Sequence, residues 1–85
     1  MTKAKIIKSY NEFKKCVKRA KTSKRMIDHE NVFFYVCEML DALKDIGLYD
    51  DFNTKIFKGE LNNCNREIQM KIADQDKIKE YISAI

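Results

Sequence analysis

The chain offers few side chains that could act as nucleophiles, general bases or metal ligands. It has one histidine, His29, and three cysteines, Cys16, Cys37 and Cys64, which lie far apart in the sequence. A structural zinc site needs four such ligands and usually includes a Cys-x-x-Cys pair, which this chain lacks. Three is also an odd number, so a disulfide framework is not favoured. We therefore expect no metal site and no cofactor, with the cysteines at or near the core of a reduced protein.

Two short motifs begin like known sites but lack a required residue. The His-Glu pair at 29–30 opens like the zinc helix His-Glu-x-x-His, yet the second histidine position holds Phe33. The Asp-Phe-Asn run at 51–53 opens like a calcium-binding loop, yet the glycine that the loop requires falls on Ile56. No nucleophile lies beside His29 in the sequence, so a Ser/His/Asp or Cys/His site is not indicated. We expect that the protein is not an enzyme.

Charge is the most informative feature of the sequence, because it is divided between two parts of the chain. Residues 1–25 contain ten lysines and arginines and one acidic residue, a net charge of +9. Residues 26–85 contain seven basic and twelve acidic residues, a net charge of −5. The total of +4 therefore conceals a strong separation of charge. A basic face of this kind packs beside acidic residues, within one molecule or between two, or binds an anionic partner.

Apolar residues spaced three and four apart predict a helix over residues 3–20. They form a stripe about 80° wide, whose members are Ile6, Tyr10, Phe13, Val17 and Ala20. The opposite face is basic and carries Lys5, Lys8, Glu12, Lys15, Lys18 and Arg19. Residues 21–25 are predicted to break the helix.

A second helix is predicted over residues 28–46. Asp28 is its candidate N-cap, and Gly47 followed by Leu48 fits the left-handed and apolar positions of a Schellman motif. Its predicted core stripe is Val32, Phe33, Val36, Met39, Leu40, Leu43 and Ile46. Phe34 projects to the opposite side, next to Ile27 and among Glu30, Glu38, Asp41 and Asp45.

The last third of the chain carries two further helical patterns. A short helix is predicted over residues 50–57, ending before Gly59. Residues 60–85 continue the helical period, and Asp74 either caps a separate last helix or lies within one long helix. The apolar positions of this segment are Leu61, Cys64, Ile68, Ile72, Ile78, Ile82 and Ile85.

These elements and the composition predict an all-α fold. The chain has no proline and two glycines, too few turn residues for a sandwich or a barrel. We expect a small single-domain bundle of about four helices over residues 1–85. No apolar stretch approaches the about 20 residues of a membrane span, and the lysine-rich start lacks the apolar segment of a signal peptide. A cytoplasmic protein with no integral membrane segment is expected.

The exposed faces point to binding rather than to catalysis. A large aromatic residue such as Phe34 on an acidic face is either covered by another helix or used at an interface. The first interpretation is a regulator, adaptor or inhibitor that docks on a partner protein. A homodimer, in which the basic helix of a second copy covers Phe34, is one form of it. The candidate contact residues are Lys8, Lys15, Lys18, Arg19, Ile27, Phe34, Glu38 and Asp41.

The alternative interpretation is sequence-tolerant nucleic-acid binding by the basic N-terminal helix. Lysines outnumber arginines 14 to 3, which favours contacts to phosphates over bidentate contacts to bases. A helix-turn-helix is not predicted, because Ile46 stands where the turn glycine would follow Ala42. The candidate contacts are Lys14, Lys15, Lys18, Arg19, Lys21, Lys24 and Arg25.

In size, basic character and helical content the chain is similar to bacteriocin immunity proteins, which are small intracellular helical bundles. Its lysine-rich, charge-divided pattern also resembles small phage and mobile-element proteins that bind and inhibit a target. Composition and charge carry these resemblances, and no motif does. They imply a protein that docks on another protein in the cytoplasm, which is the host-cell cytoplasm if the chain is phage-encoded.

Overall fold

The computed structural model describes the backbone of residues 2–85 and the side chains of residues 3–85. This part of the chain is helical with no strand, which confirms the predicted all-α class. It has five helices where about four were expected: α1 (Thr2–Thr22), α2 (Met26–Asp45), α3 (Tyr49–Phe57), α4 (Arg66–Ile72) and α5 (Gln75–Ala84). None of them is long and apolar enough to cross a lipid bilayer.

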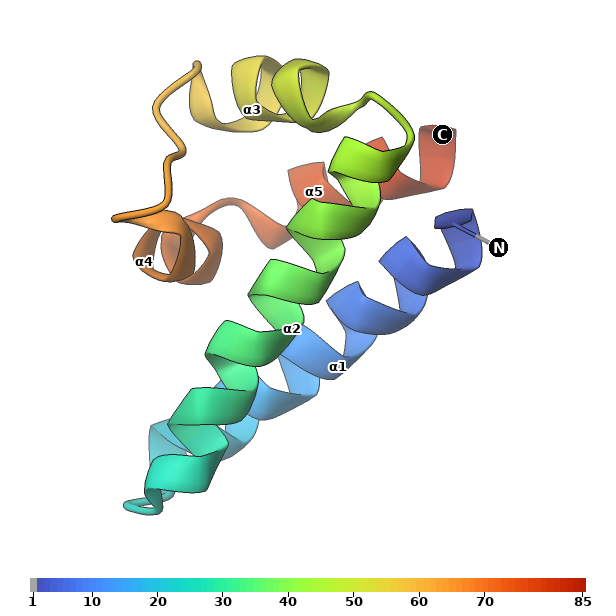
Figure 1. The fold of residues 1–85 in the computed structure, drawn as a ribbon. Helices are drawn as coiled ribbons and strands as arrows, with labels where there is room; N and C mark the ends of the chain where they lie inside the picture. Colours follow the sequence, from blue (N-terminus) through green and yellow to red (C-terminus); the bar gives the residue numbers. More distant parts are fainter. Residues whose placement is uncertain (1) are drawn as a thin grey trace.

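The two long helices, α1 and α2, form an antiparallel hairpin that is the main body of the fold (Figure 1). The three short helices gather around the end of the hairpin that holds the start of α1 and the end of α2 (Figure 1). The other end, where the chain turns from α1 into α2, projects away from them (Figure 1). The molecule is therefore elongated, with principal extents of 35 × 27 × 21 Å.

The turn between α1 and α2 is held by Ser23, and the predicted N-cap at Asp28 is wrong. α2 begins two residues earlier, at Met26, and Asp28 lies in its first turn. The Ser23 hydroxyl donates to the Asp28 carboxylate at 2.5 Å and accepts from the backbone N–H of Arg25 at 3.0 Å. The acidic side chain thus fixes the turn and lies near the positive end of the helix dipole.

The C-terminus of α2 confirms the predicted Schellman motif. Gly47 has a φ of 74°, in the left-handed region that favours glycine. The Leu48 N–H donates to the carbonyl of Leu43 at 2.9 Å, and the Gly47 N–H donates to that of Lys44 at 3.1 Å. These two bonds satisfy carbonyls that the helix end would otherwise leave unpaired.

Residues 60–85 form two helices, which answers the question that the sequence left open. Asp74 caps α5, and its carboxylate accepts from the backbone N–H groups of Asp76 and Lys77 at 3.0 and 3.4 Å. Before α4, the Asn53 side chain of α3 donates to and accepts from the backbone of Leu61, at 3.0 Å in each direction. These polar contacts fix the start of α5 and the connection that follows α3.

The core lies where α3, α4 and α5 close over one side of the hairpin. Its buried members are Ile6, Tyr10, Phe13, Cys16, Val32, Val36, Met39, Leu40, Ala42, Leu43, Phe52, Phe57, Leu61, Met70, Ile78 and Ile82. The Tyr10 hydroxyl reaches across it and donates to the backbone carbonyl of Gln75 at 2.9 Å. Most of the predicted stripes of the first two helices are therefore buried.

Several positions that the periodicity assigned to the core are exposed. Phe33 and Ile46 of the second stripe are 48% and 37% exposed. Ile68 and Ile72 on α4 are 62% and 73% exposed, because Met70 faces the core and these two residues face away from it. Among the cysteines, Cys16 is buried and Cys37 is half-buried as expected, whereas Cys64 is exposed in the turn before α4.

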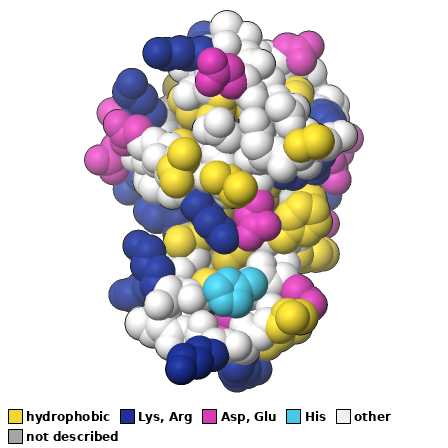
Figure 2. Space-filling model, turned by 90° about the vertical axis from the view of Figure 1, so that its left-hand side faces the viewer, with side chains coloured by type: hydrophobic (Ala, Val, Ile, Leu, Met, Phe, Trp, Pro, Cys, Tyr) yellow, Lys and Arg dark blue, Asp and Glu magenta, His cyan; other side chains and the backbone are white. Residues whose placement is uncertain are grey.

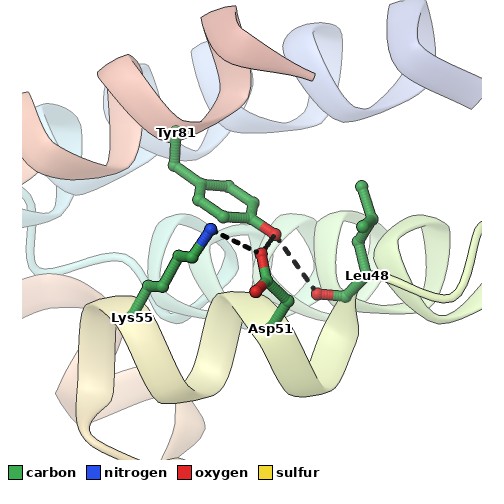
Figure 3. A network of polar contacts seen from close by, with 4 residues as sticks. All are labelled: Leu48, Asp51, Lys55 and Tyr81. Atoms are coloured by element: carbon green, nitrogen blue, oxygen red, sulfur yellow. Dashed lines mark hydrogen bonds and ion pairs between the residues drawn. The ribbon is translucent and has the colours of Figure 1, made fainter.

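A polar cluster fastens α3 to α5 (Figure 3). The Tyr81 hydroxyl donates to the Asp51 carboxylate at 2.7 Å, and the Lys55 ammonium lies 3.3 Å from the same carboxylate. Burial, and next the contact with Asp51, raise the pKa of Tyr81 to about 12. The hydrogen bond from Tyr81 is the main cause that lowers the pKa of Asp51 from its ordinary value. Both shifts favour the neutral phenol beside the ionised carboxylate.

We predict that Tyr81→Phe lowers the urea midpoint of unfolding at neutral pH and that this loss is pH-dependent. The contribution of Asp51 is present above its unfolded-state pKa and fades as the pH falls through its lower folded-state pKa. The contribution of Tyr81 is complete below its unfolded-state pKa of 10.0 and fades as the pH rises toward about 12. Urea titrations of both proteins at pH values of about 3, 7 and 11 test this. The same midpoint difference at all three would contradict it.

Candidate functional site

The N-terminal half of α2 exposes four large apolar side chains. Met26 is 74% exposed, Ile27 45%, Phe33 48% and Phe34 53%. They form two pairs with a spacing of seven residues, which is about two helical turns. Met26 and Phe33 make one strip along the helix, called the inner strip below. Ile27 and Phe34 make another about 100° around the axis, called the outer strip.

The inner strip continues the buried face of α2 beyond the short helices that cover it. Phe33 lies on the same side as Leu40, seven residues later, and Leu40 is only 1% exposed. α4 reaches α2 near Cys37, where the Arg66 guanidinium donates to the Cys37 sulfur at 3.4 Å. Phe33 is one turn further toward the projecting end. The prediction that Phe33 is buried was therefore wrong, because no helix of residues 2–85 covers that position.

A groove of about 580 Å³ lies between the hairpin and the junction of α4 with α5, and its one lining residue from α2 is His29, three residues after Met26 and four before Phe33. Figure 2 shows this face, with hydrophobic side chains and the histidine gathered around a hollow waist. Phe13, Val17 and Ala20 of α1 supply its apolar floor. The polar lining residues are Lys14, Lys18, Lys21, His29, Lys71 and Gln75. No carboxylate is among these lining residues, although Glu67 pairs with Lys71, so the three lysines of α1 supply the positive charge of the groove.

α1 presents its basic residues on two sides, which separates the predicted contact residues. The groove lysines are Lys14, Lys18 and Lys21. An outer basic face, about a third of a turn away, consists of Lys8, Lys15 and Arg19. Lys24 and Arg25 are exposed in the connection to α2. The seven residues predicted to contact nucleic acid are thus spread over two faces and a turn.

The outer strip lies on an acidic surface, as the sequence predicted for Phe34. The ring of Phe34 meets that of Tyr35 edge-on at a centroid distance of 5.1 Å, and Phe34 remains half exposed. Glu38 pairs with Lys5 of α1 at 3.8 Å, and this is the single ion pair between the two helices among residues 3–85. The predicted partner-contact set therefore spans the outer basic face, one groove lysine and the acidic surface of α2.

Two titratable groups in this part of the molecule, Cys16 and Tyr10, have shifted pKa values. Within residues 3–85 no three His, Cys, Asp or Glu side chains lie close enough together to hold a metal ion. Burial is the main cause that raises the pKa of the Cys16 thiol, which disfavours the nucleophilic thiolate. Burial, and then Asp76 and Asp74, raise the pKa of Tyr10. What the site offers chemically is an apolar surface with ordered charges around it.

Comparison of the chain with known proteins gives no assignment. No protein-family model matches it, and no curated protein or solved structure shows significant similarity to it. The two apolar strips, the groove and the surrounding charges are therefore the features from which a function can be inferred.

We predict that truncation of Phe33 costs little stability in the free protein. Phe33→Ala removes an aromatic ring that no helix covers and should lower the free energy of unfolding by less than about 1 kcal/mol. The matched control is Phe52→Ala, because Phe52 is fully buried and its loss should cost about 3–5 kcal/mol. Urea unfolding followed by circular dichroism measures both. Equal losses would contradict the uncovered position of Phe33.

Proposed function

We propose that the protein is a non-enzymatic docking domain that binds another protein and so acts as a regulator, adaptor or inhibitor. The observation that carries this proposal is the uncovered apolar surface at the projecting end of the hairpin. Exposed apolar patches with aromatic residues at their centre are typical of protein interfaces. Both strips contain a phenylalanine, and the inner strip lies within one helical turn of His29, which lines the groove.

The size of the surface is compatible with a partner protein. A compact monomer of 10.1 kDa exposes about 5,300 Å², whereas this chain exposes 5658 Å². The excess is expected from the projecting hairpin end. A standard interface buries about 800 Å² on each partner, and the four exposed apolar side chains of α2 offer anchors for an interface of that kind.

The charges around the surface support docking in one orientation. The outer strip has acidic neighbours, including Glu38 and Asp41, whereas the groove is lined by lysines. Opposite charges on two sides of one apolar surface disfavour reversed binding and speed association with a complementary partner.

The alternative function is sequence-tolerant nucleic-acid binding by α1. Its support is that the seven candidate basic side chains are exposed, and of these only Lys15 pairs with an acid, Glu12 at 3.3 Å. Exposed lysines of this kind bind phosphates with a steep salt dependence. Docking is preferred because phosphate binding leaves both phenylalanines of the strips without a role.

Affinity capture from lysate of the source cell, with and without nuclease, tests the proposal. Three baits are compared: the wild-type protein, Phe34→Asp, and Ile68→Asp as the matched control. Ile68 is 62% exposed on α4, outside both strips, so the control adds the same charge at an apolar residue at least as exposed as Phe34, which is 53% exposed.

We predict that the wild type and Ile68→Asp retain the same protein after nuclease treatment, whereas Phe34→Asp loses most of it. Interface aromatics of this kind contribute about 2 kcal/mol or more to binding. Recovery of nucleic acid alone, released by moderate salt from all three baits, would contradict docking and support the alternative.

A further inference from the structure

The groove beside the inner strip has a lining that indicates what it binds. We propose that it takes an acidic amphipathic helix of the partner protein, with its apolar residues on the groove floor and its carboxylates beside the lysines. This inference rests on the proposed docking function and adds the chemistry and secondary structure of the segment that is recognised.

Exposed apolar side chains of α2 lie within one helical turn of the groove's edge. Phe13, Val17 and Ala20 form the floor, and His29 stands at its edge. Phe33 follows His29 by four residues, so it lies on the same side of α2 one turn away. A small anionic ligand in the groove would leave Phe33 and Met26 exposed, whereas a helix that extends past the groove covers them.

The charges of the lining select an acidic partner. Lys14, Lys18 and Lys21 follow one another at spacings of four and three residues, so their ammonium groups line one side in successive turns. Lys71 stands on the α4 side, where Glu67 pairs with it at 2.8 Å. The aliphatic stems of lysines cover apolar surface while their charges reach outward. This arrangement suits carboxylates that flank an apolar stripe.

The dimensions favour a helix over an extended peptide. From Phe13 to Lys21 the groove follows α1 for eight residues, about 12 Å, or two turns of a facing helix. An amphipathic helix placed in such a groove presents apolar anchors at positions i, i+3 or i+4, and i+7. An extended peptide gains affinity from the unpaired edge of a sheet, and residues 2–85 contain no strand.

The test is selection from a displayed library of helical peptides of about 16 residues on the immobilised full-length protein. Enriched peptides are synthesised and their affinities are measured for the wild type and two double variants. Lys14→Glu/Lys18→Glu reverses two groove lysines. Lys8→Glu/Lys15→Glu makes the same change of net charge on the outer basic face. All four lysines are exposed, and circular dichroism checks that both variants keep their helices.

We expect the enriched peptides to be acidic, with apolar residues at helical spacing. Their affinity should fall at least about tenfold on Lys14→Glu/Lys18→Glu and only about twofold on the control. Long-range attraction falls equally in both variants, so the additional loss on the first measures direct contacts between the groove lysines and the peptide. Equal losses on the two variants would overturn the proposal, and so would enriched peptides without acidic residues or no enrichment at all.

Two further outcomes would assign the groove to another occupant. Sedimentation of the wild type as a dimer that Lys14→Glu/Lys18→Glu dissociates would place a second copy there. Binding of vesicles rich in anionic lipid that depends on the groove lysines, with no peptide selected, would place a lipid headgroup there. Either result overturns the inference. If instead lysate capture depends on Phe34 but not on the groove lysines, the docking function stands and this inference alone fails.

Discussion

The structure depends on a mismatch of length between two long helices and the three short ones that cover them. α1 and α2 have 21 and 20 residues, or about 30 Å each, whereas α3, α4 and α5 have 9, 7 and 10. Of the short helices, α4 reaches α2 near Cys37. The side of α2 that is buried there continues beyond Cys37 through Phe33 to Met26, where it is exposed. The same face is core at one end and uncovered at the other, which leaves an apolar surface exposed.

Much of the fold could be predicted from the sequence, because its signals are local. The stripe of α1 and the Gly47–Leu48 end of α2 depend on residues within a few turns, and the structure confirms both. The predicted cap at Asp28 failed because Ser23, five residues earlier, competes for its carboxylate and the helix starts upstream. The role of Asp74 stayed open because an aspartate can stand at the N-cap of a helix or inside one, and its place in the sequence does not distinguish the two.

Less of the candidate site could be predicted. The 100° rotation per residue was enough to place Phe34 on the acidic side of α2, and the structure adds that this side is not covered by another helix. Phe33 was misassigned because periodicity shows which residues share a face and not how far another helix covers it. The groove was missed because it joins Val17, His29 and Lys71 from three separate helices. The seven-residue spacing within each strip, Met26 to Phe33 and Ile27 to Phe34, was the signal from which the strips could have been predicted.

The most direct measurement is fluorine NMR of the free protein labelled with fluorophenylalanine, compared in H₂O and D₂O. The chain has five phenylalanines, each assigned through a Phe→Leu variant. We expect a solvent isotope shift at two resonances, those of Phe33 and Phe34, and none at Phe13, Phe52 or Phe57, which are buried. Absence of the shift at both Phe33 and Phe34 would mean that the apolar surface is already covered in solution and is not free to bind a partner.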